Sequence, residues 1–171
     1  MDTCVEAAGL VVPGVGAFRS CMNGLLKAGG DRIVRTRKEK ERPTFGICIG
    51  MQIFFETGTE PSQESPGNTQ GLGIWPGSIS KLHAPVLPHM GWNTVKVPTD
   101  SLLFAGVESE SFYFVHSYAA KAAVSQLDTW AVYGDPFVAA VEDGAFVATQ
   151  FHPEKSGAAG LALIKNWTST L

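Results

Sequence analysis

The residues that flank Cys48 are of the types and spacing expected around a nucleophile. It belongs to the run Gly46-Ile47-Cys48-Ile49-Gly50, between an apolar segment that begins at Thr44 and residues 49–56, whose apolar positions suit a helix. The G-x-C-x-G spacing is that of a nucleophile elbow, a tight strand-to-helix turn whose flanking glycines remove side chains that would collide. A lone cysteine in an apolar run would more simply be an inert buried thiol. With both glycines present, the sequence predicts a nucleophile.

The elbow also predicts how the thiol is activated. Unpaired N–H groups and the positive end of the helix dipole at the start of residues 49–56 favour the thiolate, and a nearby histidine would lower the pKa of Cys48 further. The N–H of Ile49 would point toward an oxyanion forming on an attacked carbonyl carbon. We therefore expect a lowered thiol pKa and acyl transfer through a thioester.

A histidine and a carboxylate about a hundred residues later supply the remaining groups of such a site. His152 and Glu154 follow a predicted strand that ends at Phe151. Because Pro153 favours an extended His152, the side chains of residues 152 and 154 should project to the same side. Glu154 can then receive one ring N–H, which leaves the other ring nitrogen to accept a thiol proton. The alternative is a solvated surface turn, and spacing alone does not bring this pair to Cys48.

Two motifs together resemble a known enzyme family. The run G-I-C-I-G-M-Q-x-x-F-E around Cys48 and the run Q-F-H-P-E-K-S around His152 are similar to those of the class I glutamine amidotransferases, whose triad is Cys-His-Glu. Residues 12–18, 88–93 and 113–118 resemble the glutaminase subunit of imidazole glycerol phosphate synthase, from histidine biosynthesis. The resemblance extends from about residue 9 to the C-terminus.

The resemblance implies a role for each residue of the triad. Cys48 would attack the side-chain amide carbon of L-glutamine, His152 would act first as base and then as acid toward the leaving ammonia, and Glu154 would hold His152. Water would then hydrolyse the thioester to L-glutamate. The oxyanion hole would consist of backbone N–H groups of Val15, Gly16 and Ile49. Substrate binding would fall to Gly14, Gln52, Glu60, Ser117 and Tyr118.

The resemblance also implies a partner. In the family, ammonia passes to a (β/α)8-barrel cyclase subunit, which forms imidazole glycerol phosphate and aminoimidazole carboxamide ribotide. No barrel sequence is present in this chain, so the cyclase would be a separate subunit in a heterodimer. Met90 and Trp92 would lie at the partner interface, where ammonia leaves. We expect weak glutaminase activity from the chain alone and stronger activity with the partner and its nucleotide ligand.

Taken separately, the same segments have simpler interpretations. Residues 12–16 could be an ordinary strand end, Gln52 a solvated helix residue, His116 a satisfied histidine near a strand end, and Trp92 a core or interface aromatic. Two other functions also remain open. One is a different class I cysteine hydrolase, either a glutaminase for another synthase or a γ-glutamyl hydrolase. The other is a catalytically idle interaction subunit.

The composition limits the class of protein. A chain of 171 residues with 44% hydrophobic residues predicts a single domain spanning residues 1–171. No stretch approaches a transmembrane span, and the first residues have neither a basic region nor an apolar signal core, so we expect a cytoplasmic protein without a membrane partner. Cys4, Cys21 and Cys48 lack the spacing of metal ligands and are odd in number, which favours a reducing compartment. We expect neither a metal nor a cofactor.

Charge and histidines indicate no further ligand. The net charge is −3, and the one dense charge run, residues 31–42, mixes both signs, which is typical of a solvated helix and disfavours nucleic-acid binding. His83 and His89 flank a proline-containing segment without nearby cysteines. We interpret both as loop histidines.

The order of predicted elements indicates an α/β fold. Residues 9–12 and 44–48 read as strands, and residues 18–28, 31–42 and 49–56 as helices. Residues 57–70 read as a long loop near the site, and a strand-rich part follows. Its strands are predicted at residues 73–82, 93–97, 112–118, 130–133, 137–141 and 146–151, with an Asp-Gly hairpin before the last and a closing helix at residues 158–167.

The resemblance implies a mixed sheet flanked by helices, and the chain departs from it at the start. The family opens with another strand and helix before the strand that ends in Pro-Gly-Val-Gly. Such a unit needs roughly 30 residues, whereas only Met1 to Ala8 precede the Gly9 strand. We expect a fragment, a mis-set start or the loss of this first strand–helix unit. Its loss would leave unpaired backbone groups and an exposed apolar face.

Overall fold

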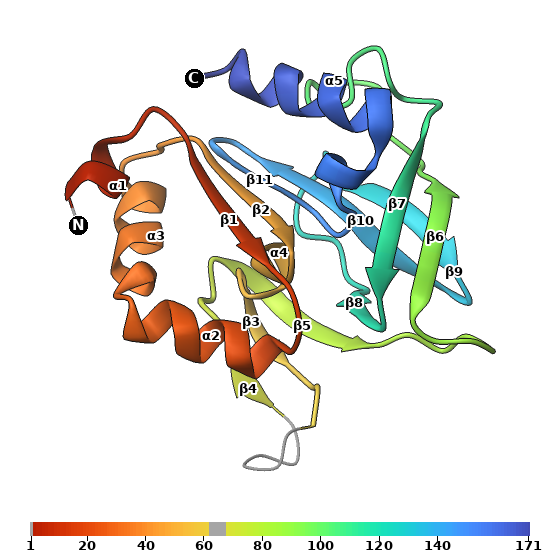
Figure 1. Cartoon of the computed structure of the whole chain (residues 1–171), viewed down its shortest axis with the longest axis horizontal. Helices are drawn as coiled ribbons and strands as arrows, with labels where there is room; N and C mark the ends of the chain where they lie inside the picture. The colour runs from red at the N-terminus through yellow and green to blue at the C-terminus, as the bar shows by residue number, and fades with distance from the viewer. Residues whose placement is uncertain (1, 62–67) are drawn as a thin grey trace.

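A five-stranded mixed sheet carries the chain. The computed structural model describes residues 2–61 and 68–171. The sheet has the order β1 (Leu10–Gly14), β2 (Thr44–Cys48), β11 (Phe146–Thr149), β10 (Asp135–Asp143) and β9 (Thr129–Tyr133) (Figure 1). Strands β1, β2 and β11 run parallel, whereas the pairs β11–β10 and β10–β9 are antiparallel. The predicted hairpin joins β10 to β11, with Gly144 at a φ of 60°. The α/β class and the mixed sheet are thereby confirmed.

Two smaller groups of strands complete the β-structure. A four-stranded sheet has the order β4 (Thr69–Gln70), β3 (Phe55–Gly58), β5 (Trp75–Lys81) and β8 (Tyr118–Ala120). A two-stranded antiparallel ribbon pairs β6 (His89–Thr94) with β7 (Ser111–His116). The ribbon stands beside the β9–β10 side of the main sheet (Figure 1).

Helices lie on both sides of the main sheet. They are α1 (Asp2–Glu6), α2 (Phe18–Lys27), α3 (Gly30–Glu39), α4 (Ile49–Gln52) and α5 (Gly157–Thr168), with a 3-10 turn, η1 (Pro153–Lys155), before α5. In Figure 1, α1, α2 and α3 lie on the side of the sheet that carries β1. Helix α5, drawn in blue, lies above the sheet. None of the helices in the described part of the chain is long and apolar enough to cross a membrane.

Period-two alternation along the sheet strands builds two apolar cores. Phe146 and Ala148 of β11 face one core, which also contains Phe18, Met51 and Trp75. Residues of the other parity face a second core that includes Val147, Phe112, Phe151 and Trp167. The first core supports α2 and α4, and the second supports α5 and the β6–β7 ribbon. The residues around Cys48 therefore sit between two packed layers.

Several predicted elements differ in type or in bounds from those of the structure. The helix predicted at residues 49–56 ends at Gln52, and Phe55–Gly58 forms β3 instead, because a short apolar run suits a buried helix and a buried strand equally well. The strand predicted at residues 93–97 lies at His89–Thr94. Residues 57–58 and 69–70 of the predicted loop belong to β3 and β4, and residues 62–67 of that loop lie outside the described part.

Arg37 contradicts the prediction of a solvated helix at residues 31–42. Its side chain is fully buried, at 0% exposure. The guanidinium donates to four carbonyl oxygens in the segment 4–8 and to the carbonyl of Pro43 at 2.6 Å, and its Nε donates to Thr44 Oγ1 at 3.2 Å. One side chain on α3 thus ties α1 and the start of β2 together. Charge patterning indicated an exposed face and could not show these tertiary acceptors.

Replacing Arg37 with Met should lower the free energy of unfolding by about 3 kcal/mol, because the partly buried carbonyls that Arg37 holds together would lose their donor. The matched control is Arg35→Met, since Arg35 is exposed on the same helix. That substitution should change stability by no more than about 0.5 kcal/mol. Urea unfolding followed by circular dichroism measures both, and equal effects would contradict the role assigned to Arg37.

Candidate active site

Cys48 occupies a strained turn between β2 and α4. Its φ is 56° and its ψ is −112°, a conformation that non-glycine residues rarely adopt and that nucleophile elbows use. A Cβ on Gly50 would lie 1.7 Å from the Val12 carbonyl oxygen, and one on Gly46 would lie 2.8 Å from the Phe54 ring. Both glycines are therefore required by close packing, as the G-x-C-x-G spacing predicts.

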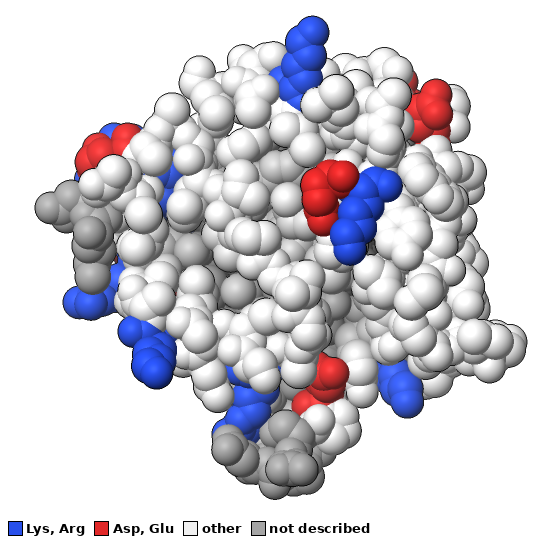
Figure 2. Space-filling model, viewed as in Figure 1, with Lys and Arg blue, Asp and Glu red and all other residues white. Residues whose placement is uncertain are grey.

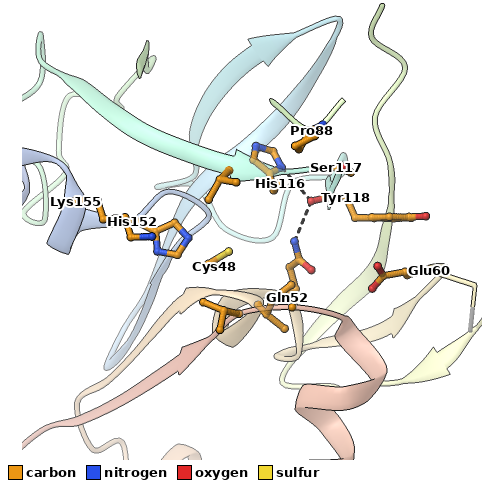
Figure 3. Close-up of a pocket in the computed structure, with 13 residues that line it drawn as sticks. Cys48, Gln52, Glu60, Pro88, His116, Ser117, Tyr118, His152 and Lys155 are labelled. Carbon is orange, nitrogen blue, oxygen red and sulfur yellow. Dashed lines mark hydrogen bonds between the residues drawn. The ribbon is translucent and has the colours of Figure 1, made fainter. Parts of the chain in front are cut away.

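A cavity of about 360 Å³ opens above this turn. Its walls, drawn in Figure 3, come from six separate segments of the chain. Its lining residues are Val15, Gly16, Cys48, Ile49, Gln52, Glu60, Pro88, Val115, His116, Ser117, Tyr118, His152 and Lys155. The fold thus collects most of the predicted site residues around one space.

His152 and Glu154 form the predicted pair. The Nδ1 atom of His152 lies 2.6 Å from Glu154 Oε1, and the backbone of His152 is extended, with φ −99° and ψ 96°. Pro153 then begins η1, which turns Glu154 back toward the ring. The imidazole is buried while the carboxylate is half exposed. The ring points toward Cys48 (Figure 3), so Nε2 is left to face the thiol.

The Cys48 thiol differs from its predicted state. Burial raises its pKa to about 11, and the nearby Ile49 N–H opposes this rise only in part. The prediction of a lowered pKa was wrong because it considered only the stabilisation of the thiolate by the helix start. It did not consider the loss of water around a side chain that is 4% exposed. The resting side chain is therefore a protonated thiol, which could act as a nucleophile only after it loses its proton to a base.

Gln150 is a site residue that motif reading missed. Its Nε2 donates toward Cys48 Sγ at 3.8 Å, and its Oε1 accepts from Gln52 Nε2 at 3.0 Å. The other Gln52 N–H donates to the Tyr118 carbonyl at 2.9 Å, the contact drawn in Figure 3. Position 150 has the same parity as His152 in an extended segment, a signal that could have found it.

The predicted oxyanion residues line the same cavity as Cys48. Val15 and Gly16 line the cavity after β1, and Gly16 has a φ of 92° that favours glycine. The Cys21 thiol on α2 donates to the Val15 carbonyl at 3.3 Å, which turns that oxygen toward α2. Gly14 lies behind this wall and pairs with Cys48 in the sheet register. A Cβ on Gly14 would lie only 2.8 Å from the Gly50 nitrogen, so a larger residue does not fit there.

The predicted substrate side chains lie at the other end of the cavity. Glu60, Ser117 and Tyr118 line it, and Figure 3 shows Glu60 far from His152. One oxygen of Glu60 accepts from the backbone N–H of Phe18 at 2.9 Å, at the start of α2. A carboxylate at this end suits the ammonium group of an amino acid whose side chain reaches Cys48.

Met90 and Trp92 lie outside the cavity on the solvent face of β6, with exposures of 63% and 59%. Their partners across the ribbon are Val115 and Tyr113, and Val115 itself lines the cavity. The area over β6 in Figure 2 shows few charged side chains. An exposed apolar ribbon therefore adjoins the mouth of the site.

The two histidines interpreted as loop residues have different surroundings. His83 lies in a loop, where its exposed ring contacts Asp135 at 3.0 Å. His89 begins β6 and is buried, so its interpretation as a loop histidine was wrong. Its environment could not be predicted locally because it depends on the pairing of β6 with β7.

Comparison with known proteins gives one consistent result. The profile of the family described as "Glutamine amidotransferase class-I" matches residues 6–169. Two relatives described as "Imidazole glycerol phosphate synthase subunit HisH" come from Mycolicibacterium paratuberculosis and Streptomyces avermitilis, with 53% and 54% identity. Each alignment covers 99% of this chain and 82% of the relative.

A solved structure described as "Crystal structure of glutamine amidotransferase" has a TM-score of 0.66 and 19% identity, and the match covers 94% of this chain and 79% of that one. At this identity the likeness shows the fold alone. The family profile and the relatives carry the assignment further. The chain belongs to the class I glutamine amidotransferases and, among them, to the HisH subunits of imidazole glycerol phosphate synthase.

Proposed function

We propose that this chain hydrolyses L-glutamine to L-glutamate and ammonia with Cys48 as nucleophile, His152 as base and Glu154 as the group that orients His152. One observation carries the proposal. In a single cavity, the buried His152 ring is held at Nδ1 by Glu154 and faces the strained Cys48 elbow. Family membership supplies the reaction class, and this arrangement supplies the residues.

The reaction follows from the positions of these groups. Nε2 of His152 takes the thiol proton as Cys48 Sγ attacks the side-chain amide carbon of glutamine. The oxyanion lies against the Ile49 N–H and the Val15-Gly16 segment. His152 returns the proton to the leaving ammonia, and water then cleaves the thioester with His152 again as base. Glu154 keeps Nδ1 protonated throughout, so Nε2 starts each step as an acceptor.

The substrate amino acid would extend from Cys48 toward Glu60. The side-chain amide must reach the sulfur, and Glu60 lies at the far end of the cavity, where its carboxylate suits the substrate ammonium. Ser117 and Tyr118 form the wall between the two ends. Gln52 supports that wall through the Tyr118 carbonyl. Gly14 contributes by permitting the close packing beneath the site.

We also infer that ammonia passes to a separate (β/α)8-barrel cyclase subunit that forms imidazole glycerol phosphate and aminoimidazole carboxamide ribotide. The exposed apolar face of β6, with Met90 and Trp92, supports a partner surface beside the cavity mouth. Ile47 packs against both apolar cores, which supports a single domain. The free thiols of Cys4, Cys21 and Cys48 fit a reducing cytoplasm.

The triad is tested by trapping and by turnover. Cys48→Ala should abolish both glutamate release and the intact-mass adduct with a glutamine-analogue electrophile. His152→Gln should lower kcat by about 10²- to 10⁴-fold, as expected for loss of a positioned base. Glu154→Gln should lower kcat less than His152→Gln does, because a neutral amide can still contact Nδ1. Cys4→Ser, on the exposed N-terminal helix, is the matched thiol control and should retain activity.

Two outcomes of the same assays would support other functions. A folded protein, by circular dichroism, that forms no adduct at Cys48 would indicate an idle interaction subunit. Release of glutamate from γ-glutamyl peptides but not from glutamine would indicate a γ-glutamyl hydrolase. Either result would overturn the proposed reaction while leaving the family assignment intact.

Alkylation of Cys48 should depend steeply on pH. Because burial raises the thiol pKa to about 11, the reactive thiolate is the minor form near neutrality. Its fraction, and therefore the rate with iodoacetamide, should rise about tenfold per pH unit below that value. Peptide mass spectrometry measures the rate at Cys48, with free cysteine, pKa about 8.5, as the reference thiol. A rate that levels off near pH 7 would show that the resting group is a thiolate.

Addition of the cyclase with its nucleotide ligand should increase the glutaminase rate. Trp92→Ala should weaken cyclase binding by tenfold or more, at about 1.4 kcal/mol or above, since a large exposed aromatic at an interface is a typical hot spot. Leu26→Ala is the control because Leu26 is also an exposed apolar residue but lies on α2. Isothermal titration calorimetry measures the affinity. Equal glutaminase rates with and without the cyclase would contradict the partner role.

A further inference from the structure

Two buried histidines lie beside the cavity and take no part in the reaction described above. His89 on β6 and His116 on β7 are directly opposite each other in the ribbon, with exposures of 3% and 6%. The Nδ1 atom of His89 lies 3.0 Å from Nε2 of His116, and Nδ1 of His116 lies 3.0 Å from the Tyr118 carbonyl oxygen. Only His116 lines the cavity.

The contacts determine one arrangement of protons. A carbonyl oxygen only accepts, so Nδ1 of His116 carries a hydrogen. Burial lowers the pKa of His116 to about 3, so its ring is neutral and Nε2 is an acceptor. His89 must then donate from Nδ1. Burial also lowers the pKa of His89, to about 4, which leaves its Nε2 to accept from the Asn93 amide at 3.4 Å.

The pair is held rigidly by its neighbours. The His89 ring stacks on Tyr133 with centroids 4.0 Å apart and on Phe114 at 4.9 Å. The Asn93 amide also donates to the Val132 carbonyl at 3.1 Å, which anchors this end of the chain of hydrogen bonds to β9. Stacked, neutral rings with fixed tautomers present a directed donor to Tyr118.

The Tyr118 carbonyl connects the histidines to the nucleophile. Its two lone pairs are filled by His116 Nδ1 and by Gln52 Nε2. The second N–H of Gln52 fixes the orientation of the Gln150 amide, whose own N–H faces Cys48 Sγ. The hydrogen bonds therefore run without a break from the β6–β7 ribbon to the sulfur.

We propose that His116, oriented by His89, is a positioning residue for the glutaminase reaction, because it fixes the Tyr118 carbonyl and through it the Gln52 and Gln150 amides against Cys48. The proposal rests on the proposed function for its catalytic consequence. It adds a role for two histidines that are not members of the proposed triad. The wall of the substrate cavity is then held in place by a chain of neutral donors.

A matched pair of substitutions at His116 separates positioning from packing. In His116→Asn the amide reaches the place of Nδ1 and can still donate to Tyr118, whereas in His116→Gln it reaches the place of Nε2 and contacts His89 instead. The Gln variant should lose about tenfold in kcat/KM for glutamine, the effect of leaving a buried carbonyl without one donor. The Asn variant should lose clearly less. Thermal unfolding of the two should be similar.

The same pair should differ in the reactivity of Cys48 without any substrate. The iodoacetamide rate at Cys48 should fall in His116→Gln relative to His116→Asn, because the Gln150 donor is displaced only in the former. The iodoacetamide rate at Cys48 should likewise be higher in His89→Asn, which keeps a donor toward His116, than in His89→Gln. A purely structural role predicts that each Asn and Gln pair behaves alike, and that result would overturn the proposal.

The ring tautomers provide a readout that is independent of turnover. Nitrogen-15 spectra of labelled wild-type protein should show both rings neutral and protonated at Nδ1 between about pH 5 and 8. A ring protonated at Nε2, or a charged ring in this range, would also overturn the proposal. If wild-type protein releases no glutamate yet these spectra and alkylation differences are found, the proposed function fails and the positioning role stands. If the wild-type protein releases glutamate but the Asn and Gln variants behave identically, the proposed function stands and the positioning role fails.

Discussion

The contact between Gly50 and the Val12 carbonyl is the constraint on which the rest of the site depends. With 1.7 Å available for a Cβ, only glycine lets α4 begin directly against β1. That approach forces the turn at Cys48 into a positive φ and aims its sulfur into the cavity. It also brings Ile49 and the segment after β1 to the same cavity as the sulfur. The proposed nucleophile and the proposed oxyanion donors are thus positioned by one packing contact.

The same packing determines the electrostatics of the nucleophile. A sulfur pressed between two layers has little water around it, so its protonated form is favoured and its pKa rises to about 11. Two kinds of group compensate for this. Gln150 and Ile49 present N–H donors to the sulfur, and in the proposed reaction the ring held by Glu154 provides a base at the moment of attack.

The sequence was informative where the chemistry is local and uninformative where it depends on tertiary contacts. Glycines spaced around Cys48 and the His152-Pro153-Glu154 run carry their geometry in a few neighbouring residues, so the elbow and the His–Glu pair could be predicted. Arg37 and His89 could not, because their partners lie on other elements. The end of α4 at Gln52 was missed for a related reason: the apolar run after it is equally compatible with helix and strand.

The β6–β7 ribbon unites the two functions assigned to this chain. Because side chains alternate across a strand, His89 faces inward while its neighbour Met90 faces solvent. On β7, His116 faces inward and its neighbour Val115 points to the opposite face of the ribbon. The outward set can bind a partner, and the inward set reaches the Tyr118 carbonyl and the wall of the substrate cavity. A partner that shifts the ribbon must therefore move the donors behind it. The period of a β-strand alone is sufficient to connect the proposed partner surface with the wall of the cavity in which we propose that glutamine binds.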